Sequence, residues 1–252
     1  MRCTCIAILL AAPVALLALP ASAQDYEREK RWSDEVVPGL VVGDAVWLDG
    51  PGGRKFLALH TEAAKPRAAF VIVHGVGVHP DHGVIGTLRT ALADAGYATL
   101  SIQMPVQRAE AGLADYHPTV FPNAVERIRS AARWLGAKGF DRIVLLSHSM
   151  GSWMSTVYFE ETPGSPFAAW VCMGLSGGYG NMRNVKVPVL DVYGENDLAN
   201  VLRADWRRRM TIDSIAGSRQ VRIAGADHFY AGKEKALVAA IDEFVRSAVL
   251  PK

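Results

Sequence analysis

Ile143-Val144-Leu145-Leu146-Ser147-His148-Ser149-Met150-Gly151 is the part of the sequence that is most informative about the fold. Its first four residues are all apolar, which is typical of a strand buried on both faces of a parallel sheet. The residues that follow, 152–158, have a helical pattern. The stretch therefore predicts a strand, a sharp turn and a helix, with Ser149 at the tip of the turn.

Such a turn is the setting of a nucleophile elbow, in which a strained backbone exposes the serine oxygen. The turn is so sharp that the residues two before and two after the serine must be small. Gly151 satisfies this fully, whereas Ser147 stands where glycine is usual. A hydroxymethyl group is still small, so Ser149 remains a candidate nucleophile.

Outward from this stretch, short β-rich runs alternate with amphipathic segments. Eight strands are predicted, at 45–48, 54–61, 68–73, 98–103, 141–147, 168–175, 187–193 and 219–224. Apolar stripes predict helices over 85–95, over 125–135 with Asn123 as the cap, and over 237–245. This alternation predicts an α/β fold: a single-domain, doubly wound, mostly parallel eight-stranded sheet with helices on both faces.

Composition excludes several classes of protein. The chain has 252 residues, half of them apolar, and a formal charge of +2. It is long enough for one sizeable core and too apolar to be disordered. The charge provides no basic field for nucleic acid, and the body holds no apolar run of membrane-spanning length. The run Arg207-Arg208-Arg209 is interpreted as a solvated helix face.

The amino-terminal segment has the pattern of a secretory signal peptide. Arg2 precedes an apolar stretch over 6–19, and Ala21-Ser22-Ala23 follows as the cleavage site. A retained membrane anchor is the alternative, which Pro13 and the short apolar stretch disfavour. We therefore predict cleavage after residue 23 and an exported protein, periplasmic or secreted, with no stable membrane span.

The remaining chain divides into a leader over 24–43, expected on the domain surface, and one domain over 44–252. No linker or internal repeat divides that domain. After cleavage, Cys172 is the only cysteine, so no internal disulfide can form. Its apolar neighbours indicate a buried thiol.

Three segments together resemble the α/β-hydrolase superfamily, over roughly residues 45 to 248. In that family the chain order is nucleophile, acid, histidine. The segment 187–197 resembles the strand and turn that carry the acid, and 221–228 resembles the last strand and the histidine loop. The resemblance implies Ser149 as nucleophile and His228 as its base.

Two aspartates compete for the acid role. Asp191 lies within a predicted strand, whereas Asp197 lies just past its carboxyl end. Reacting groups in an open α/β sheet gather outside the carboxyl ends of the strands, which favours Asp197. Asp197 alternatively serves only as a turn residue. Asp191 requires a buried partner, which the sequence does not identify.

The segment His74-Gly75-Val76-Gly77 follows a predicted strand and resembles the oxyanion segment of the same superfamily. Two backbone amides must point at the oxygen that becomes negative. We expect these from Met150, at the start of a helix, and from Val76, with Gly77 as the alternate. His74 is expected to brace the loop.

Other chemistry has weaker signals in the sequence. His79, Asp81 and His82 offer metal-ligand side chains, but spacings this short recur by chance. No Gly-rich string of the phosphate-binding type is present. We therefore predict no metal and no cofactor.

The resemblance implies a serine hydrolase, acting on a small-molecule or polymeric carboxylic ester through an acyl-enzyme formed by Ser149, Asp197 and His228. Thioester and peptide substrates stay open, as does a catalytically silent binding or scaffold protein of the cell envelope. The segment 176–186 is too short for a lid domain, which favours an open site. Apolar walls are expected from the loop 105–121 and from Trp153, Tyr179 and Phe229, with ordinary packing as the alternative.

Overall fold

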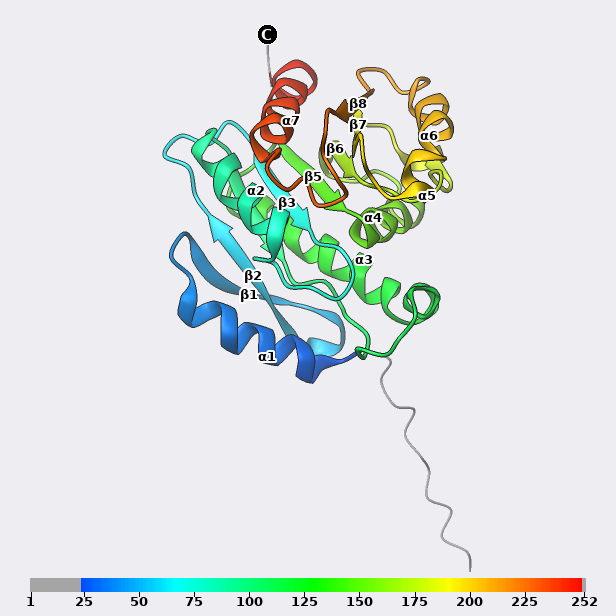
Figure 1. Cartoon of the computed structure of the whole chain (residues 1–252). Coiled ribbons are helices and arrows are strands. Elements are labelled where there is room, and N and C mark those ends of the chain that lie inside the picture. Colours follow the sequence, from blue (N-terminus) through cyan, green and yellow to red (C-terminus); the bar gives the residue numbers. More distant parts are fainter. Residues whose placement is uncertain (1–23, 251–252) are drawn as a thin grey trace, which may run out of the picture.

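The computed structural model describes residues 24–250, and the predicted signal peptide over 1–23 lies outside these residues. Its centre is one eight-stranded sheet with the order β1-β2-β4-β3-β5-β6-β7-β8 (Figure 1). The strands are β1 (Asp44–Asp49), β2 (Lys55–Thr61), β3 (Ala69–Val73), β4 (Ala98–Ile102), β5 (Ile143–His148), β6 (Phe167–Met173), β7 (Val189–Gly194) and β8 (Arg219–Ile223). Each predicted strand is found, with both ends within two residues of the prediction.

The pairing confirms the predicted mostly parallel sheet. β2 runs antiparallel to both β1 and β4, and every other neighbouring pair is parallel. The central strands β3, β5 and β7 are buried along their whole length. Because parallel strands end at the same edge, residues that follow β3, β5, β7 and β8 meet there.

Helices cover both faces of the sheet, as predicted. α2 (Gly83–Asp94) and α7 (Glu234–Ala248) pack side by side over one face, and α3 (Leu113–Ala137), α4 (Met150–Glu161) and α6 (Asp205–Ile212) pack over the other (Figure 1). The short α5 (Ala199–Leu202) follows β7. Within residues 24–250, no helix combines the length and apolarity that a membrane crossing requires.

The sequence-based loop over 105–121 is wrong for its second half, because α3 already begins at Leu113. Asn123, predicted as the cap, lies inside this helix. Proline interrupts helix hydrogen bonding, and Pro118 and Pro122 both stand in the first half of this helix. The apolar stripe that packs α3 on the sheet nevertheless continues into this half through buried residues four apart, Tyr116, Val120 and Ala124.

The segment 24–43 holds α1 (Tyr26–Val36) and a short 3-10 helix, Val37–Gly39. Glu29 is buried and forms an ion pair with Arg127 at 2.7 Å. Arg28 donates hydrogen bonds to the carbonyl oxygens of Gln107 and Gly77. α1 is thereby fixed to the loop that follows β3, one of the loops at the edge where the parallel strands end.

Candidate active site

Ser149 lies at a strained turn between β5 and α4. Its backbone angles are φ 55° and ψ −120°, and positive φ is uncommon for a residue with a side chain. The turn requires glycine two residues later: a Cβ on Gly151 would lie 2.5 Å from the carbonyl oxygen of His74. This is the local geometry of a nucleophile elbow.

Ser147 replaces the first glycine of the motif because its hydroxyl finds partners in the core. Its Oγ accepts a hydrogen bond from Nε1 of Trp170 at 2.9 Å and lies 3.2 Å from Oγ of Ser152. Ser147 is completely buried, so an unpaired hydroxyl there would cost stability. The departure from the usual motif is thus accommodated by packing.

Ser149, His228 and Asp197 form a hydrogen-bonded row at the carboxyl edge of the sheet. Oγ of Ser149 lies 2.9 Å from Nε2 of His228, and Nδ1 of His228 lies 2.6 Å from Oδ1 of Asp197. With Nδ1 carrying the proton, His228 donates to Asp197 and accepts from the serine hydroxyl. The residues follow β5, β8 and β7 respectively, far apart in the chain but at one edge.

Asp197 is held by backbone donors as well as by the imidazole. Its Oδ2 accepts from the amide of Gly194 at 3.1 Å, and its Oδ1 accepts from the amide of Leu198 at 2.7 Å. Burial acts to raise the pKa of Asp197, but the hydrogen bonds and the charge of His228 outweigh it and hold the pKa below its usual value. The carboxylate is therefore charged at neutral pH.

Asp191, the competing aspartate, has a different partner. Nε of Arg208 lies 3.0 Å from both of its carboxylate oxygens, and both side chains are fully buried. Gln220 donates to the same carboxylate at 2.7 Å. The interpretation of Arg208 as part of a solvated face is therefore wrong. Arg208 also donates to the carbonyl oxygens of Leu175, Gly177 and Val201.

Two backbone amides beside Ser149 are available to bind an oxyanion. The amides of Val76 and Met150 donate no hydrogen bond to any residue within 24–250. Both residues line the same cavity as Ser149, whereas Gly77 does not. The loop runs close to the nucleophile, because a Cβ on Gly75 would lie 3.3 Å from Cβ of Ser149.

His74 braces this loop. It is completely buried, with Nδ1 donating to the carbonyl oxygen of Gly75 at 2.8 Å and Nε2 accepting from the amide of Met104 at 2.8 Å. Burial lowers the pKa of His74 to about 3. The imidazole is therefore neutral and does not titrate near neutral pH.

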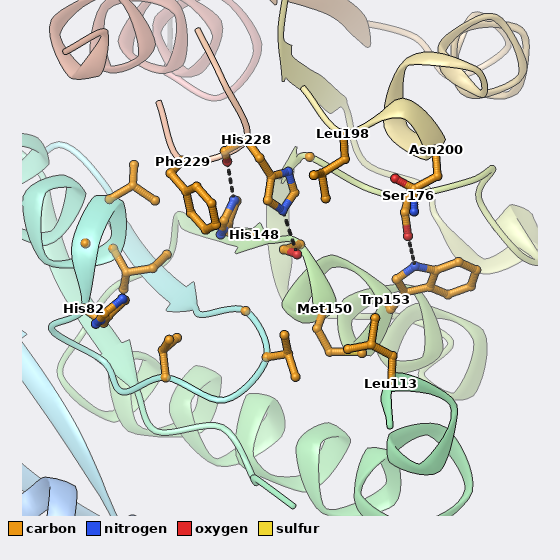
Figure 2. A pocket seen from close by; sticks show the side chains of 18 of the residues that line it. His82, Leu113, His148, Met150, Trp153, Ser176, Leu198, Asn200, His228 and Phe229 are labelled. Carbon is orange, nitrogen blue, oxygen red and sulfur yellow. Dashed lines mark hydrogen bonds between the residues drawn. The ribbon is translucent and has the colours of Figure 1, made fainter. Parts of the chain in front are cut away.

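Sequence reasoning missed two residues that shape the surroundings of His228. Gly174 has φ 57°, and a Cβ there would lie 2.9 Å from Cε1 of His228. Nε2 of His148 lies 2.9 Å from the carbonyl oxygen of His228, to which it donates (Figure 2). The sequence places His148 in the elbow and Gly174 in the predicted strand over 168–175, but no local pattern reveals contacts with so distant a residue.

A cavity of about 1000 Å³ opens beside Ser149 (Figure 2). Trp153 and Phe229 line it, as expected, and so do Leu113 and Phe121 in the first half of α3. Tyr179 does not line it: its ring packs on Trp170, and its hydroxyl donates to Asp191 at 3.4 Å. The connection between β6 and β7 holds only the short 3-10 helix Met182–Asn184, consistent with the predicted minimal lid.

Two of the three candidate metal ligands, His79 and Asp81, accept hydrogen bonds from other groups of the protein. The carboxylate of Asp81 accepts two hydrogen bonds from Arg89, at 3.0 and 2.7 Å. Nδ1 of His79 accepts from the amide of Asp81 at 3.3 Å. Across residues 24–250, no three His, Cys, Asp or Glu side chains are grouped so as to hold a metal ion.

Residues 2–127 match the family DUF3530, described as a protein of unknown function. The chain belongs to this family. The matched half includes the loop with His74 and Val76 but ends within α3, before Ser149. None of the curated proteins matches the chain in sequence.

Solved structures establish the α/β-hydrolase fold. A serine hydrolase without a lid from Xanthomonas campestris has a TM-score of 0.67 and 20% identity, covering 84% of this chain and 97% of its own. A dienelactone hydrolase from Anabaena variabilis gives 0.65 and 20%, covering 82% and 99%. Est1E from Butyrivibrio proteoclasticus gives 0.64 and 17%, covering 81% and 98%.

Proposed function

We propose that the chain is a serine hydrolase that cleaves carboxylic esters through an acyl-enzyme on Ser149. The observation that carries the proposal is the row Ser149–His228–Asp197, with contacts of 2.9 and 2.6 Å, at a strained turn between two free amides. An unactivated serine hydroxyl is a weak nucleophile, and an adjacent oriented base is the usual means of activating it.

The first half of the reaction forms the acyl-enzyme. Oγ of Ser149 attacks the carbonyl carbon while its proton passes to Nε2 of His228. Asp197 stabilises the imidazolium that forms and holds the ring in the required tautomer. The amides of Met150 and Val76 donate to the oxyanion of the tetrahedral intermediate. Nε2 then returns the proton to the alcohol oxygen as the carbon–oxygen bond breaks.

The second half repeats these steps with water. His228 takes a proton from water as the water oxygen attacks the acyl carbon, and then returns the proton to Ser149 as the acid leaves. No step requires a metal or an organic cofactor.

Ester hydrolysis by the wild type and by Ser149→Ala tests the proposal. We expect the variant to lower kcat by roughly 10⁴ to 10⁶ while its melting temperature stays within a few degrees. A variant that retains hydrolysis within about tenfold of the wild type would mean that Ser149 is not the nucleophile. A folded wild type with no activity on any ester favours a catalytically silent binding protein instead.

The same proposal includes export. The basic start, the apolar stretch and the Ala21-Ser22-Ala23 site support removal of residues 1–23 and release into the periplasm or medium. Intact mass measurement of the protein from a bacterial host tests this, with a mature chain beginning at Gln24 as the expected result. A mass that retains residues 1–23 contradicts it.

A further inference from the structure

The cavity beside Ser149 has a wall on each side of His228. In Figure 2, Phe229 and His82 lie on one side of His228, and Trp153, Leu113 and Asn200 lie on the other. The volume, about 1000 Å³, is at the upper end of the range that binds drug-sized ligands. A small ester such as an acetate leaves most of it unfilled.

Large apolar side chains are exposed on these walls. Leu113 is 64% exposed, Phe229 is 64% exposed and Leu198 is 49% exposed, and all three line the cavity. Exposed apolar surface gathered at one concave site is typical of a ligand-binding site. A substrate group that covers these side chains removes apolar surface from water and is bound more tightly for it.

The charge of the walls is the second observation. None of the described residues that line the cavity is lysine or arginine, and Glu234 is the single carboxylate among them. His148, inside the cavity, has its pKa lowered to about 4 by burial and by the charge of His228, so it provides no positive charge near neutral pH. An anionic group entering this cavity would lose its hydration without gaining a cationic partner.

We propose that this cavity selects neutral esters that carry an apolar group of several carbons, and disfavours esters whose acyl chain ends in a carboxylate. The inference rests on the proposed ester hydrolysis at Ser149 and adds the substrate class. It also narrows the sequence-based expectation of a small-molecule or polymeric ester to an ester with a sizeable apolar group. Each methylene fully covered by the walls raises kcat/KM by roughly fourfold, and partial covering raises it less.

Three p-nitrophenyl esters test the inference at pH 8, above the titration range of an ordinary imidazole. These are the acetate, the octanoate and the monoester of suberic acid, whose eight-carbon acyl chain ends in a carboxylate. We expect kcat/KM for the octanoate to exceed that for the acetate by at least about tenfold, and the suberate to lose most of this gain. An octanoate no better than the acetate, or a suberate equal to the octanoate, overturns the inference.

A pair of variants tests whether the walls cause the selectivity. Leu113→Lys places a cation in the cavity, and Met210→Lys makes the same change at a side chain 67% exposed on α6, outside the cavity. We expect Leu113→Lys to raise the suberate-to-octanoate ratio of kcat/KM by about tenfold, and Met210→Lys to change it less than twofold. Equal ratios in the two variants contradict the role of this wall.

The outcomes separate the inference from the proposed function. Hydrolysis of the acetate that depends on Ser149, without preference for the octanoate, removes the inference and leaves the proposed function standing. No hydrolysis of any of the three esters by folded wild type removes both. Leu113→Gln, a neutral change at the same exposed position, shows whether any loss in Leu113→Lys comes from disturbing the start of α3.

Discussion

Nε2 of His148 donates a hydrogen bond to the backbone carbonyl oxygen of His228 at 2.9 Å. His148 immediately precedes Ser149, and its ring lies 4.8 Å from that of His228, tilted by 39°. The bond therefore joins the elbow that carries the serine to the loop that carries its proposed base. Because it acts on the backbone of His228, it holds the ring near Ser149 without contacting the reacting atoms.

Replacing His148 tests this positioning role. His148→Phe keeps a planar ring but removes the donor, and it leaves the buried carbonyl of His228 unpaired. We expect kcat to fall by about tenfold with KM little changed, because His228 spends less time within reach of Ser149. Steady-state kinetics on one ester measures both constants.

The control is His148→Gln, whose side-chain amide also donates. We expect it to recover most of the kcat lost in His148→Phe. If both variants match the wild type, or if both lose kcat equally, the hydrogen bond to His228 does not position the base.

Acid stability provides a separate test of the same residue. Burial, followed by the charge of His228, lowers the pKa of His148 to about 4. Between about pH 6.5 and 4 the unfolded chain binds a proton at this position and the folded chain does not, so stability falls as the pH falls through this window. Each such histidine contributes a slope of about 1.4 kcal/mol per pH unit.

Urea unfolding at several pH values measures that slope. We expect the free energy of unfolding of His148→Gln to fall less steeply between pH 6.5 and 4 than that of the wild type, by about 1.4 kcal/mol per unit. His74, whose pKa is also lowered, contributes equally to both proteins. Parallel curves would contradict a neutral, buried His148.

The two aspartates are expected to separate catalysis from stability. Asp197→Asn leaves His228 without a negative partner, so we expect kcat to fall by roughly 10³ to 10⁴ with a modest change in melting temperature. Asp191→Asn leaves Arg208 buried and unpaired, which costs about 3–5 kcal/mol of stability. Below its melting temperature, Asp191→Asn should retain kcat within about tenfold.

Calorimetry and kinetics on both variants check this pair. If Asp191→Asn loses more kcat than Asp197→Asn, each measured while folded, then Asp191 and not Asp197 acts as the acid. Equal thermal stability of the two variants would contradict the buried ion pair with Arg208.

Gly151 is expected to tolerate no side chain. A Cβ there would lie 2.5 Å from the carbonyl oxygen of His74 and 2.8 Å from that of Val73, and backbone atoms cannot move aside cheaply. We expect Gly151→Ala to lower stability by about 1–3 kcal/mol and to lower kcat, since it displaces the loop with Val76.

Gly136→Ala is the matched control, because its Cβ would meet nothing within 4 Å in α3. We expect its stability to be unchanged or raised by up to about 1 kcal/mol. Thermal unfolding of the two variants compares them, and equal stabilities would exclude crowding at Gly151.

The strands were predictable because their signal is local. A continuous apolar run such as 69–73 shows both the strand and its burial, and the order of strands and helices then restricts the topology. The positions of Ser149, Asp197 and His228 at the ends of their strands follow from the same topology. The start of α3 was not predictable. Proline usually interrupts a helix, and Pro118 and Pro122 lie in the first half of α3, which packing on the sheet nevertheless keeps helical.

Contacts between distant residues account for the other misses. Nothing near Arg208 in the sequence distinguishes it from the neighbouring arginines, and its burial depends on Asp191, 17 residues away. The contact of His148 with His228 spans 80 residues. Such pairings become visible only when the fold brings the strand ends together.

Covalent labelling with a fluorophosphonate probe tests whether Ser149 is an activated nucleophile, since the probe reacts with an activated serine. The labelled residue is identified by mass spectrometry of the digested protein. We expect a single adduct on Ser149 in the wild type, absent in Ser149→Ala and strongly reduced in a folded His228→Gln variant. No adduct on folded wild type, or an adduct on another serine that persists in Ser149→Ala, would contradict it.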